Sequence, residues 1–384
     1  MSKYSELLGG PKKAKALSMA AVLTVLVATL WPFNPIPPNG VTWLKNANGL
    51  KFERAGIVVS TEPFKLRQPS DQKSYTLELL LQAASVKFLA TILGFYSPTR
   101  PAKQFLVMRR SDGLLVTRNP SVQRDTTGNV KFDVDHVFHS STLVFLAISS
   151  GRHGTTVWVN GQRAQDFPHF EIAANDLTGQ MVLGTSPTAY RPWNGEMRGL
   201  AIYARELNDR EALEHYRSWT GASPFETSDR EDVIARYLFM EGSGREVHNE
   251  VASNPDLSIP ARFRVPHKPF LESPIREFRT TWEYAHDLAA NVAGFVPLGL
   301  IVFSFFAWTR TRWNAAIATV ILCGLLSFVI EVSQYYIPKR GSGMTDIITN
   351  TLGAALGVLL MQSSLLRKPL ERIGVIPTAS NVGC

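Results

Sequence analysis

Charge-free apolar segments lie near the two ends of the chain, and a long polar region separates them. The segments are Ala16 to Phe33, Leu288 to Trp308, Trp313 to Ile330 and Ile347 to Leu366. Each has about 18 to 21 residues, and at ~1.5 Å per residue such a helix crosses a hydrocarbon core of ~30 Å. The pattern therefore predicts four transmembrane helices, at residues 16–33 and about 288–308, 313–333 and 346–366.

The first apolar segment has two possible interpretations, a cleaved signal peptide or a permanent anchor. It is long for the apolar part of a signal peptide, and Ala28 to Pro32 contains no small-residue cleavage site. We therefore expect an uncleaved anchor.

Basic residues predict the orientation of these helices. They are concentrated in residues 1–15, in the loop from Thr309 to Arg312 and in the tail 367–384. Short loops rich in Lys and Arg stay in the cytoplasm, so both termini are expected there. The polar region then lies outside the cytoplasmic membrane, as does a short loop whose Lys339 and Arg340 depart from the rule.

The polar region has the alternation of an all-β protein. Short strands such as Tyr75 to Leu81 and Thr142 to Ile148 are separated by turns, and Thr155 to Val159 runs into Asn160-Gly161. An Asn-Gly pair between such strands is a strong hairpin signal. We predict a β-sandwich over residues 40–220, followed at 221–283 by either an additional strand around Tyr237 to Gly244 or a structured linker.

Polar residues form one-sided stripes on three of the predicted membrane helices. The stripes contain Asp287, Asn291 and Gly294, then Gly324, Ser327, Glu331 and Gln334, then Asp346, Asn350, Gly353 and Gly357. A carboxylate within the bilayer costs about 3 kcal/mol, so these groups are expected to face one another. We predict a pocket around Asp287, Glu331 and Asp346, capped by Lys339 and Arg340, with hydrogen bonds from Asn291, Gln334 and Asn350.

The alternative for these residues is structural. The polar groups would then join the helices or lie among the lipid headgroups, and Gly353 and Gly357 would permit close helix approach in either case.

Four motifs in the polar region resemble those of laminin-G-like, concanavalin A-like domains. They are Trp158 to Gly161, Leu183-Gly184, Asn194 to Met197 and Ile202 to Leu207. The resemblance implies a sandwich that binds carbohydrate or protein. Some relatives hydrolyse glycans, but no E-x-D-x-E run is present here. The candidate ligand-binding residues are Trp158, Asn160, Tyr190 and Trp193, with a place in the core as the alternative for the aromatic ones.

The membrane helices resemble the VanZ-like family. The residues that carry this resemblance, over 284–366, are Asp287, Asn291, Gly294-Phe295, Pro297-Leu298-Gly299, Glu331, Gln334, Arg340, Asp346, Asn350-Thr351, Gly353 and Gly357. The resemblance implies a bacterial envelope protein, in a family named for a glycopeptide-antibiotic resistance phenotype. It implies no particular reaction. The sandwich is inserted where simple members have a short connection.

Charge and cysteine content exclude two further classes of protein, nucleic-acid-binding proteins and disulfide-stabilised ones. The net charge is +8, but the basic residues flank the apolar segments, so membrane orientation explains them better than nucleic-acid binding. The only cysteines, Cys323 and Cys384, exclude a disulfide framework. No cofactor is predicted. Calcium in the sandwich is possible, but no metal ligands can be assigned.

Three functions remain open. The first is a non-enzymatic membrane protein whose sandwich binds an envelope polysaccharide, an exopolysaccharide or an extracytoplasmic protein. The second is a membrane enzyme for a lipid-linked or cell-wall precursor, with Glu331 or Asp346 as base and Arg340 on a phosphate. The third is a small transporter, in which four helices would require a homo-oligomer.

Overall fold

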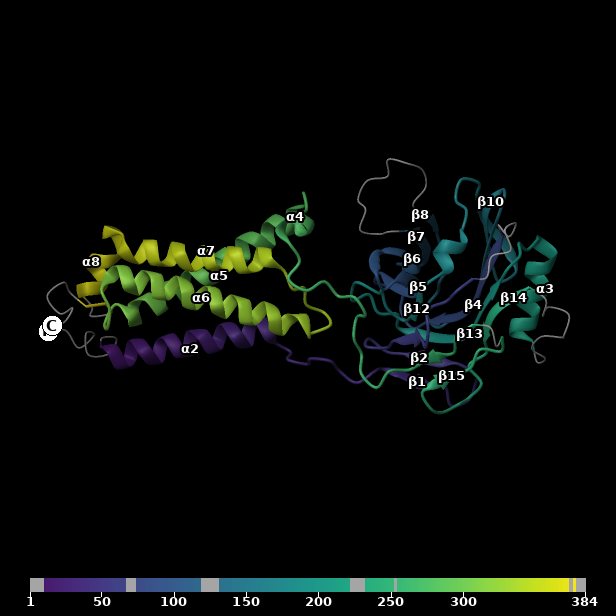
Figure 1. Cartoon of the computed structure of the whole chain (residues 1–384), viewed down its shortest axis with the longest axis horizontal. Coiled ribbons are helices and arrows are strands. Elements are labelled where there is room, and N and C mark those ends of the chain that lie inside the picture. The colour runs from purple at the N-terminus through teal and green to yellow at the C-terminus, as the bar shows by residue number, and fades with distance from the viewer. Residues whose placement is uncertain are drawn as a thin grey trace. The chain divides into compact units, whose positions relative to one another are not determined.

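The computed structural model describes residues 10–66, 74–118, 131–221, 232–251, 254–372 and 376–377. It divides the chain into two compact units, and Figure 1 labels their helices and strands. One unit joins residues 1–35 to 269–384, and the other is Ile36–Lys268. The predicted basic segment 1–15 and tail 367–384 lie partly outside the described residues.

The unit Ile36–Lys268 is built on two antiparallel sheets. The first sheet has the order β1 (Val41–Trp43), β2 (Leu50–Phe52), β13 (Gly195–Tyr203), β4 (Tyr75–Ala83), β9 (Leu143–Gly151), β10 (Gly154–Val159), β11 (Gln162–Phe167), with β14 (Val233–Tyr237) also paired to β13. The second has the order β15 (Glu246–Val247), β16 (Leu257–Ser258), β3 (Val58–Ser60), β12 (Gln180–Leu183), β5 (Ala90–Ser97), β6 (Arg100–Arg110), β7 (Gly113–Arg118), β8 (Lys131–Val134). The prediction of an all-β sandwich is confirmed.

A continuous apolar core joins the two sheets. Alternate residues of the strands point into it, among them Phe95 and Leu146, each at most 1% exposed. The predicted hairpin turn is present between β10 and β11, where Asn160 and Gly161 have φ angles of 53° and 76°. The sandwich thus folds on apolar burial and turn geometry, as the sequence without a disulfide framework requires.

The residues after the helix α3 (Asp209–Thr220) extend both sheets. In the first sheet, Ala235 of β14 pairs with Ile202 of β13. In the second, Leu257 of β16 pairs with Ser60 of β3. Phe239, between these strands, is 1% exposed in the core. The added strand β14 meets the predicted segment Tyr237 to Gly244 only at Tyr237, and residues 238–244 lie outside the strands.

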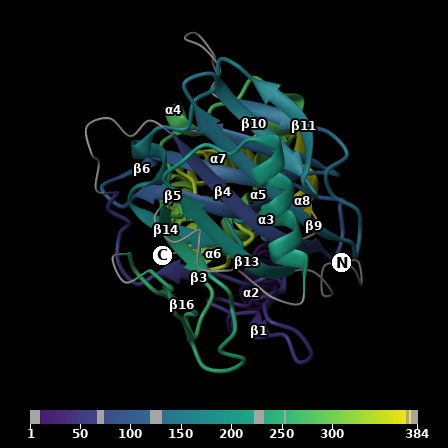
Figure 2. The same cartoon turned by 90° about the vertical axis from the view of Figure 1, so that its right-hand side faces the viewer.

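Helix α3 covers the outer face of the first sheet, the side turned to the viewer in Figure 2. The buried Glu78 of β4 holds it there: its two carboxylate oxygens lie 2.6 Å from His215 Nδ1 and 2.8 Å from Trp219 Nε1. Gly199 of β13 allows this packing, because a Cβ there would lie 1.9 Å from the Trp219 ring. A carboxylate buried without such donors would cost several kcal/mol.

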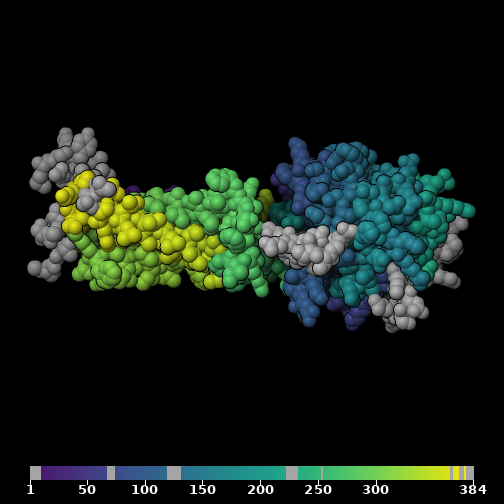
Figure 3. All heavy atoms as spheres, turned by 90° about the horizontal axis from the view of Figure 1, so that it is seen from above, coloured from purple at the N-terminus to yellow at the C-terminus, as the bar shows by residue number. Residues whose placement is uncertain are grey.

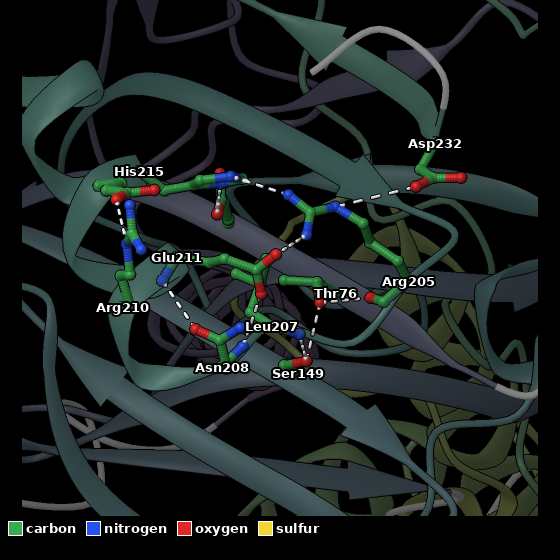
Figure 4. Close-up of polar contacts among 11 residues, drawn as sticks. Thr76, Ser149, Arg205, Leu207, Asn208, Arg210, Glu211, His215 and Asp232 are labelled. Atoms are coloured by element: carbon green, nitrogen blue, oxygen red, sulfur yellow. Dashed lines mark hydrogen bonds and ion pairs between the residues drawn. The ribbon is translucent and has the colours of Figure 1, made fainter. Parts of the chain in front are cut away.

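The start of α3 is fixed by a second set of polar contacts, drawn in Figure 4. Asn208 caps the helix: its Oδ1 accepts from Glu211 N at 3.0 Å, and Glu211 accepts from Asn208 N at 2.8 Å. Arg205 donates to Glu211 Oε1 at 2.7 Å and lies 3.1 Å from His215 Nε2. The motif Ile202 to Leu207 therefore attaches this helix to the sheet.

The described residues of the other unit form four helices long and apolar enough to cross a membrane. They are α2 (Pro11–Leu30), α5 (Trp282–Phe306), α6 (Arg312–Tyr335) and α7 (Met344–Gln362). Two short helices accompany them, α4 (Pro274–Glu277) and α8 (Ser364–Arg372). Helix α2 packs in this unit, and Ser18 Oγ donates to Ile301 O of α5 at 3.1 Å. Helix α5 begins six residues before the predicted 288, because Thr281 caps it through Tyr284 N.

Helices α5 and α7 are in backbone contact. A Cβ added to Gly353 would lie 2.3 Å from Val292 O, and one added to Gly357 would lie 2.3 Å from Val296 O. In the space-filling view the yellow α7 lies along its green neighbours (Figure 3). These two glycines have the packing role that the sequence predicted for them.

This contact predicts the effect of one methyl group at two glycines. Gly353→Ala is expected to lower stability by about 1–3 kcal/mol, because the helices must separate to admit the new Cβ. Gly294→Ala, on α5, is the matched control, since a Cβ there meets no atom within 4 Å. Thermal unfolding of the full chain in detergent measures both. Equal losses would contradict the assigned contact.

The cap of α3 predicts a pH dependence. Burial raises the pKa of Glu211, but hydrogen bonds from Asn208 N–H and Arg205 outweigh burial, so this pKa lies below its ordinary value of 4.5. A depressed pKa adds stability above the unfolded-state value, and this stability is lost as the pH falls through the folded value. Glu211→Gln is expected to cost about 1 kcal/mol at pH 7, and progressively less below about pH 4.5.

Urea unfolding of residues 36–268 at pH 7 and at low pH measures this difference. Glu214→Gln is the control, because that carboxylate pairs on the same helix with the exposed Arg210. A Glu211→Gln deficit that does not change with pH would contradict the assignment.

Candidate functional site

A pair of carboxyl groups lies where α6 ends and α7 begins. Glu331 of α6 is 2% exposed, and its Oε2 accepts from Gly343 N at 2.9 Å. Asp346 lies in the first turn of α7, and its carboxyl group lies near enough to that of Glu331 for the two to interact. Two neighbouring carboxyl groups can serve as an acid and a base.

Two predicted amides lie near this pair, one in contact with Asp346 and one a helical turn away. Asn291 Nδ2 of α5 donates to Asp346 Oδ1 at 2.8 Å. One helical turn further along, Asn350 Nδ2 of α7 donates to Ser327 Oγ of α6 at 3.0 Å. The structure therefore brings together Glu331, Asp346, Asn291 and Asn350, which come from three helices.

The first turn of α7 explains why carboxyl groups collect at this point. The N–H groups at a helix start have no partners within the helix and form its positive end. Glu277 of α4 supplies an acceptor, since its Oε2 accepts from Thr345 N at 3.0 Å and also from the Thr345 hydroxyl. Ser342 Oγ donates to Glu331 O at 3.0 Å.

Sequence reasoning missed Glu277 and Ser342. Glu277 lies in the region interpreted as strand or linker, on a helix of four residues, where no periodicity distinguishes it. The one feature of the sequence that could have indicated Glu277 is its position four residues before Thr281, the cap of α5. A Cβ at Gly343 would lie 1.6 Å from Glu277 Oε1, so this glycine is needed for the contact.

Four other predicted pocket residues lie outside the pair. Asp287 and Lys339 are exposed, and among the described residues no hydrogen bond joins either of them to it. Gln334 Nε2 donates to Thr29 O at 3.0 Å, and Arg340 Nη2 donates to Trp31 O at 3.3 Å. Both therefore bond carbonyls at the end of α2, where a helix leaves acceptors without partners.

The four residues predicted to bind a ligand in the sandwich are buried or hydrogen-bonded to other parts of the domain. Trp158 is 2% exposed beneath α3, with Nε1 2.8 Å from Asp209 Oδ1, and Trp193 is fully buried. Asn160 Oδ1 accepts from Phe145 N at 2.9 Å in the hairpin turn. Tyr190 donates to Arg54 O at 2.6 Å. Both tryptophans are buried, as the alternative of a place in the core requires. None of the four residues forms a stacking surface with the others.

A different group of polar and aromatic residues lies in loops at one end of the sandwich. Phe88 is 72% exposed just before β5, whose first residue Ala90 pairs with Arg109 of β6. In the β6–β7 turn, Asp112 Oδ2 lies 2.7 Å from His136 Nδ1 of the loop after β8. The hydrogen bond from His136 lowers the pKa of Asp112, which keeps this carboxylate ionised and able to accept hydrogen bonds near neutral pH.

The same loops contain strained backbone. Ser111, His136 and Ser141 have φ angles of 54°, 57° and 58°. A left-handed conformation costs a residue with a Cβ about 1–2 kcal/mol, and such residues gather where a loop shape is needed for binding. Hydrogen bonds join these loops, including Phe138 N to Asp112 O and Ser141 N to Ala83 O, both at 2.7 Å. We call the surface formed by residues 84–89, 111–112 and 135–141 the loop end.

A hollow of about 210 Å³ lies where β8 and β11 approach. Phe132, Phe167 and His169 line it. Within the described ranges, no group of three or more His, Cys, Asp or Glu side chains could hold a metal ion. Calcium binding stays a prediction from the resemblance.

Two protein families match the chain, each mainly in one of the two units. Residues 239–367 match the VanZ/LLP1 family, and residues 60–212 match the concanavalin A-like lectin/glucanases superfamily. The chain joins a VanZ-like membrane domain to a concanavalin A-like domain. The VanZ match begins at residue 239, within the segment that completes the sandwich. No curated protein matches the chain in sequence.

Solved structures similar to the chain include two of carbohydrate-binding type. One is a candidate carbohydrate-binding protein from Bacteroides ovatus, 12% identical, with a TM-score of 0.39 over 58% of this chain and 62% of that one. The chain thus spans less than two thirds of that protein. The other is the CBM40 domain of a Ruminococcus gnavus sialidase bound to sialyllactose, 14% identical, with a TM-score of 0.33 over 44% of this chain and 95% of that domain.

The carboxyl pair predicts a contrast between two substitutions of Glu331. Glu331→Gln keeps an oxygen for Gly343 N–H and gains an amide that donates to Asp346, so the VanZ-like domain is expected to keep its stability. Glu331→Ala leaves the buried Gly343 N–H without an acceptor and is expected to cost about 1–3 kcal/mol. Thermal unfolding in detergent compares the two. Equal destabilisation would show that the negative charge itself is required for folding.

Proposed function

We propose that the chain is a bacterial cell-envelope protein whose sandwich binds a glycan outside the cytoplasmic membrane, with the VanZ-like domain as its anchor. The lectin and glucanase superfamily match over 60–212 supports a carbohydrate ligand. The two units support separate roles in binding and anchoring. The sandwich has its own core, and the described residues of the other unit form four membrane-length helices.

The basic flanks of the helices support the orientation. Lys12, Lys13 and Lys15 lie at the start of α2, Arg310 precedes α6 and Arg312 begins it, and Arg367 and Lys368 follow α7. All three sites are expected on the cytoplasmic side. The sandwich, which connects the opposite ends of α2 and α5, is then outside.

The loop end is the observation that carries the proposal of glycan binding. The exposed Phe88 offers an aromatic face for the C–H surface of a sugar ring. The Asp112 carboxylate offers an acceptor for sugar hydroxyl groups, and charge-assisted hydrogen bonds of this kind are strong and directional. Hydrogen bonds from His136 Nδ1 and Phe138 N hold Asp112 in place without a bound ligand, which reduces the entropy lost on binding.

A second function is supported by the carboxyl pair. Two neighbouring carboxyl groups, with Glu331 buried and Asp346 half-buried, are suited to general acid–base chemistry on a lipid-linked or cell-wall precursor. This function requires that Glu331→Gln, a variant expected to fold, abolishes the biological activity of the chain. The glycan-binding function requires no such loss.

The binding test uses both the purified full chain and residues 36–268, against envelope polysaccharide and exopolysaccharide fractions, measured by calorimetry. Saturable binding by both is expected. Phe88→Ala is expected to weaken it roughly fivefold to tenfold, the size of a lost aromatic contact. Asp112→Asn is expected to weaken it about tenfold or more.

Met240→Ala is the matched control, because Met240 is 57% exposed on the same unit but outside the loop end. Loss of binding in His169→Ala, with Phe88→Ala unchanged, would move the site to the hollow beside β8 and β11. Absence of binding to every fraction by a folded chain would contradict glycan recognition and favour chemistry at the carboxyl pair.

A further inference from the structure

A cleft of about 300 Å³ lies at the end of the helical unit that carries the α5–α6 turn. Its apolar lining includes Phe303 and Ala307 at the end of α5, Met361 at the end of α7, and Ile376. All four side chains are at most 6% exposed. The cleft therefore has an apolar floor formed by residues far apart in the sequence.

Two guanidinium groups line the same cleft. Arg312 Nη2 of α6 lies 3.1 Å from Glu371 Oε1, and Arg367 Nε of α8 lies 2.9 Å from the same oxygen. The hydrogen bond from Arg367, with the charges of both arginines, lowers the pKa of Glu371, so this carboxylate is ionised at neutral pH. One carboxylate for two guanidinium groups leaves a net charge of +1 at this point.

The arginines have donor capacity that Glu371 does not use. Each guanidinium carries five N–H donors, and both side chains are more than a third exposed. The fork geometry of these donors matches a phosphate group, which accepts two of them at once. An anion bound between Arg312 and Arg367 would neutralise the remaining charge.

The position of the cleft restricts the ligand further. Its floor is continuous with the apolar ends of membrane-length helices, and Trp313, also in its lining, is 73% exposed. Exposed tryptophans next to basic residues are typical of the membrane–water boundary. A ligand of this cleft must therefore be anionic on one side and apolar on the other.

We propose that the cleft binds an anionic phospholipid, with its phosphate on Arg312 and Arg367 and the start of an acyl chain against Phe303 and Met361. Basic pockets between membrane helices on the cytoplasmic side are suited to such headgroups. The bound lipid would connect α8 to α6 in addition to Glu371. This site is independent of the sandwich, so it does not rest on the proposed glycan binding.

The test measures thermal unfolding of the full chain in detergent with added phosphatidylglycerol, phosphatidylcholine or inorganic phosphate. Phosphatidylglycerol alone is expected to raise the unfolding temperature, with a saturable dose response. An equal shift with phosphatidylcholine would overturn the role of the charge. An equal shift with inorganic phosphate would overturn the assignment to a lipid.

Variants of one helix separate a site from a general surface charge. Arg367→Gln is expected to weaken the apparent phosphatidylglycerol affinity about tenfold, the size of a lost charge-assisted hydrogen bond. Lys368→Gln removes the same charge from the neighbouring, exposed position of α8, outside the cleft lining, and is expected to change it less than about twofold. Equal losses would overturn the proposal.

A third variant covers the case in which Arg367→Gln does not fold. Glu371→Gln keeps an acceptor for both arginines but removes its negative charge, so it is expected to strengthen the phosphatidylglycerol affinity severalfold. A cleft in which the arginines serve only to bond Glu371 predicts no gain, and an unchanged or weaker affinity would overturn the proposal.

Discussion

Backbone contact between α5 and α7 is the constraint on which the VanZ-like domain depends. The helices approach closely because Gly353 and Gly357 present no side chain to the carbonyls of Val292 and Val296. At this separation Asn291 of α5 reaches Asp346 of α7. A larger residue at either glycine would move the amide away from the carboxylate, so the polar site and the helix packing are one arrangement.

The start of α7 then gives the acidic residues a physical reason to gather. Its free N–H groups attract carboxylates, and Glu331, Glu277 and Asp346 come to it from three different helices. This arrangement both stabilises the fold and leaves two carboxyl groups, Glu331 and Asp346, close together. A structural and a chemical role can therefore coexist at the same residues, and only variants that keep the hydrogen bonds can separate them.

Aromatic and charged residues of the concanavalin A-like motifs stabilise the fold, although the sequence suggested that some of them bind a ligand. The tryptophans of its motifs fill the core or lie beneath α3, and Glu78 and Arg205 hold that helix on the sheet. The motifs that identify the fold are therefore those that build it. The exposed Phe88 and the more accessible Asp112 lie in loops instead, where they can vary without loss of the core.

The sequence predicts the four membrane-length helices found among the described residues, the β-sandwich, the Asn160-Gly161 turn and close helix approach at Gly353 and Gly357. These features follow from local patterns: unbroken apolar runs, period-two alternation, turn residues and small residues at helical spacing. The polar stripes also identified Glu331, Asp346, Asn291 and Asn350 as neighbours, because a bilayer offers such groups no water.

Which polar residues meet and which aromatic residues are exposed depends on contacts made in the folded chain. Glu277 reaches α7 from a helix without periodicity, while Arg340 bonds the end of α2 instead of the carboxyl pair. Trp158 is covered by a helix about fifty residues further along the chain, and Phe88 is left exposed. Such outcomes depend on contacts between distant segments, and a linear pattern carries no information about which segments meet.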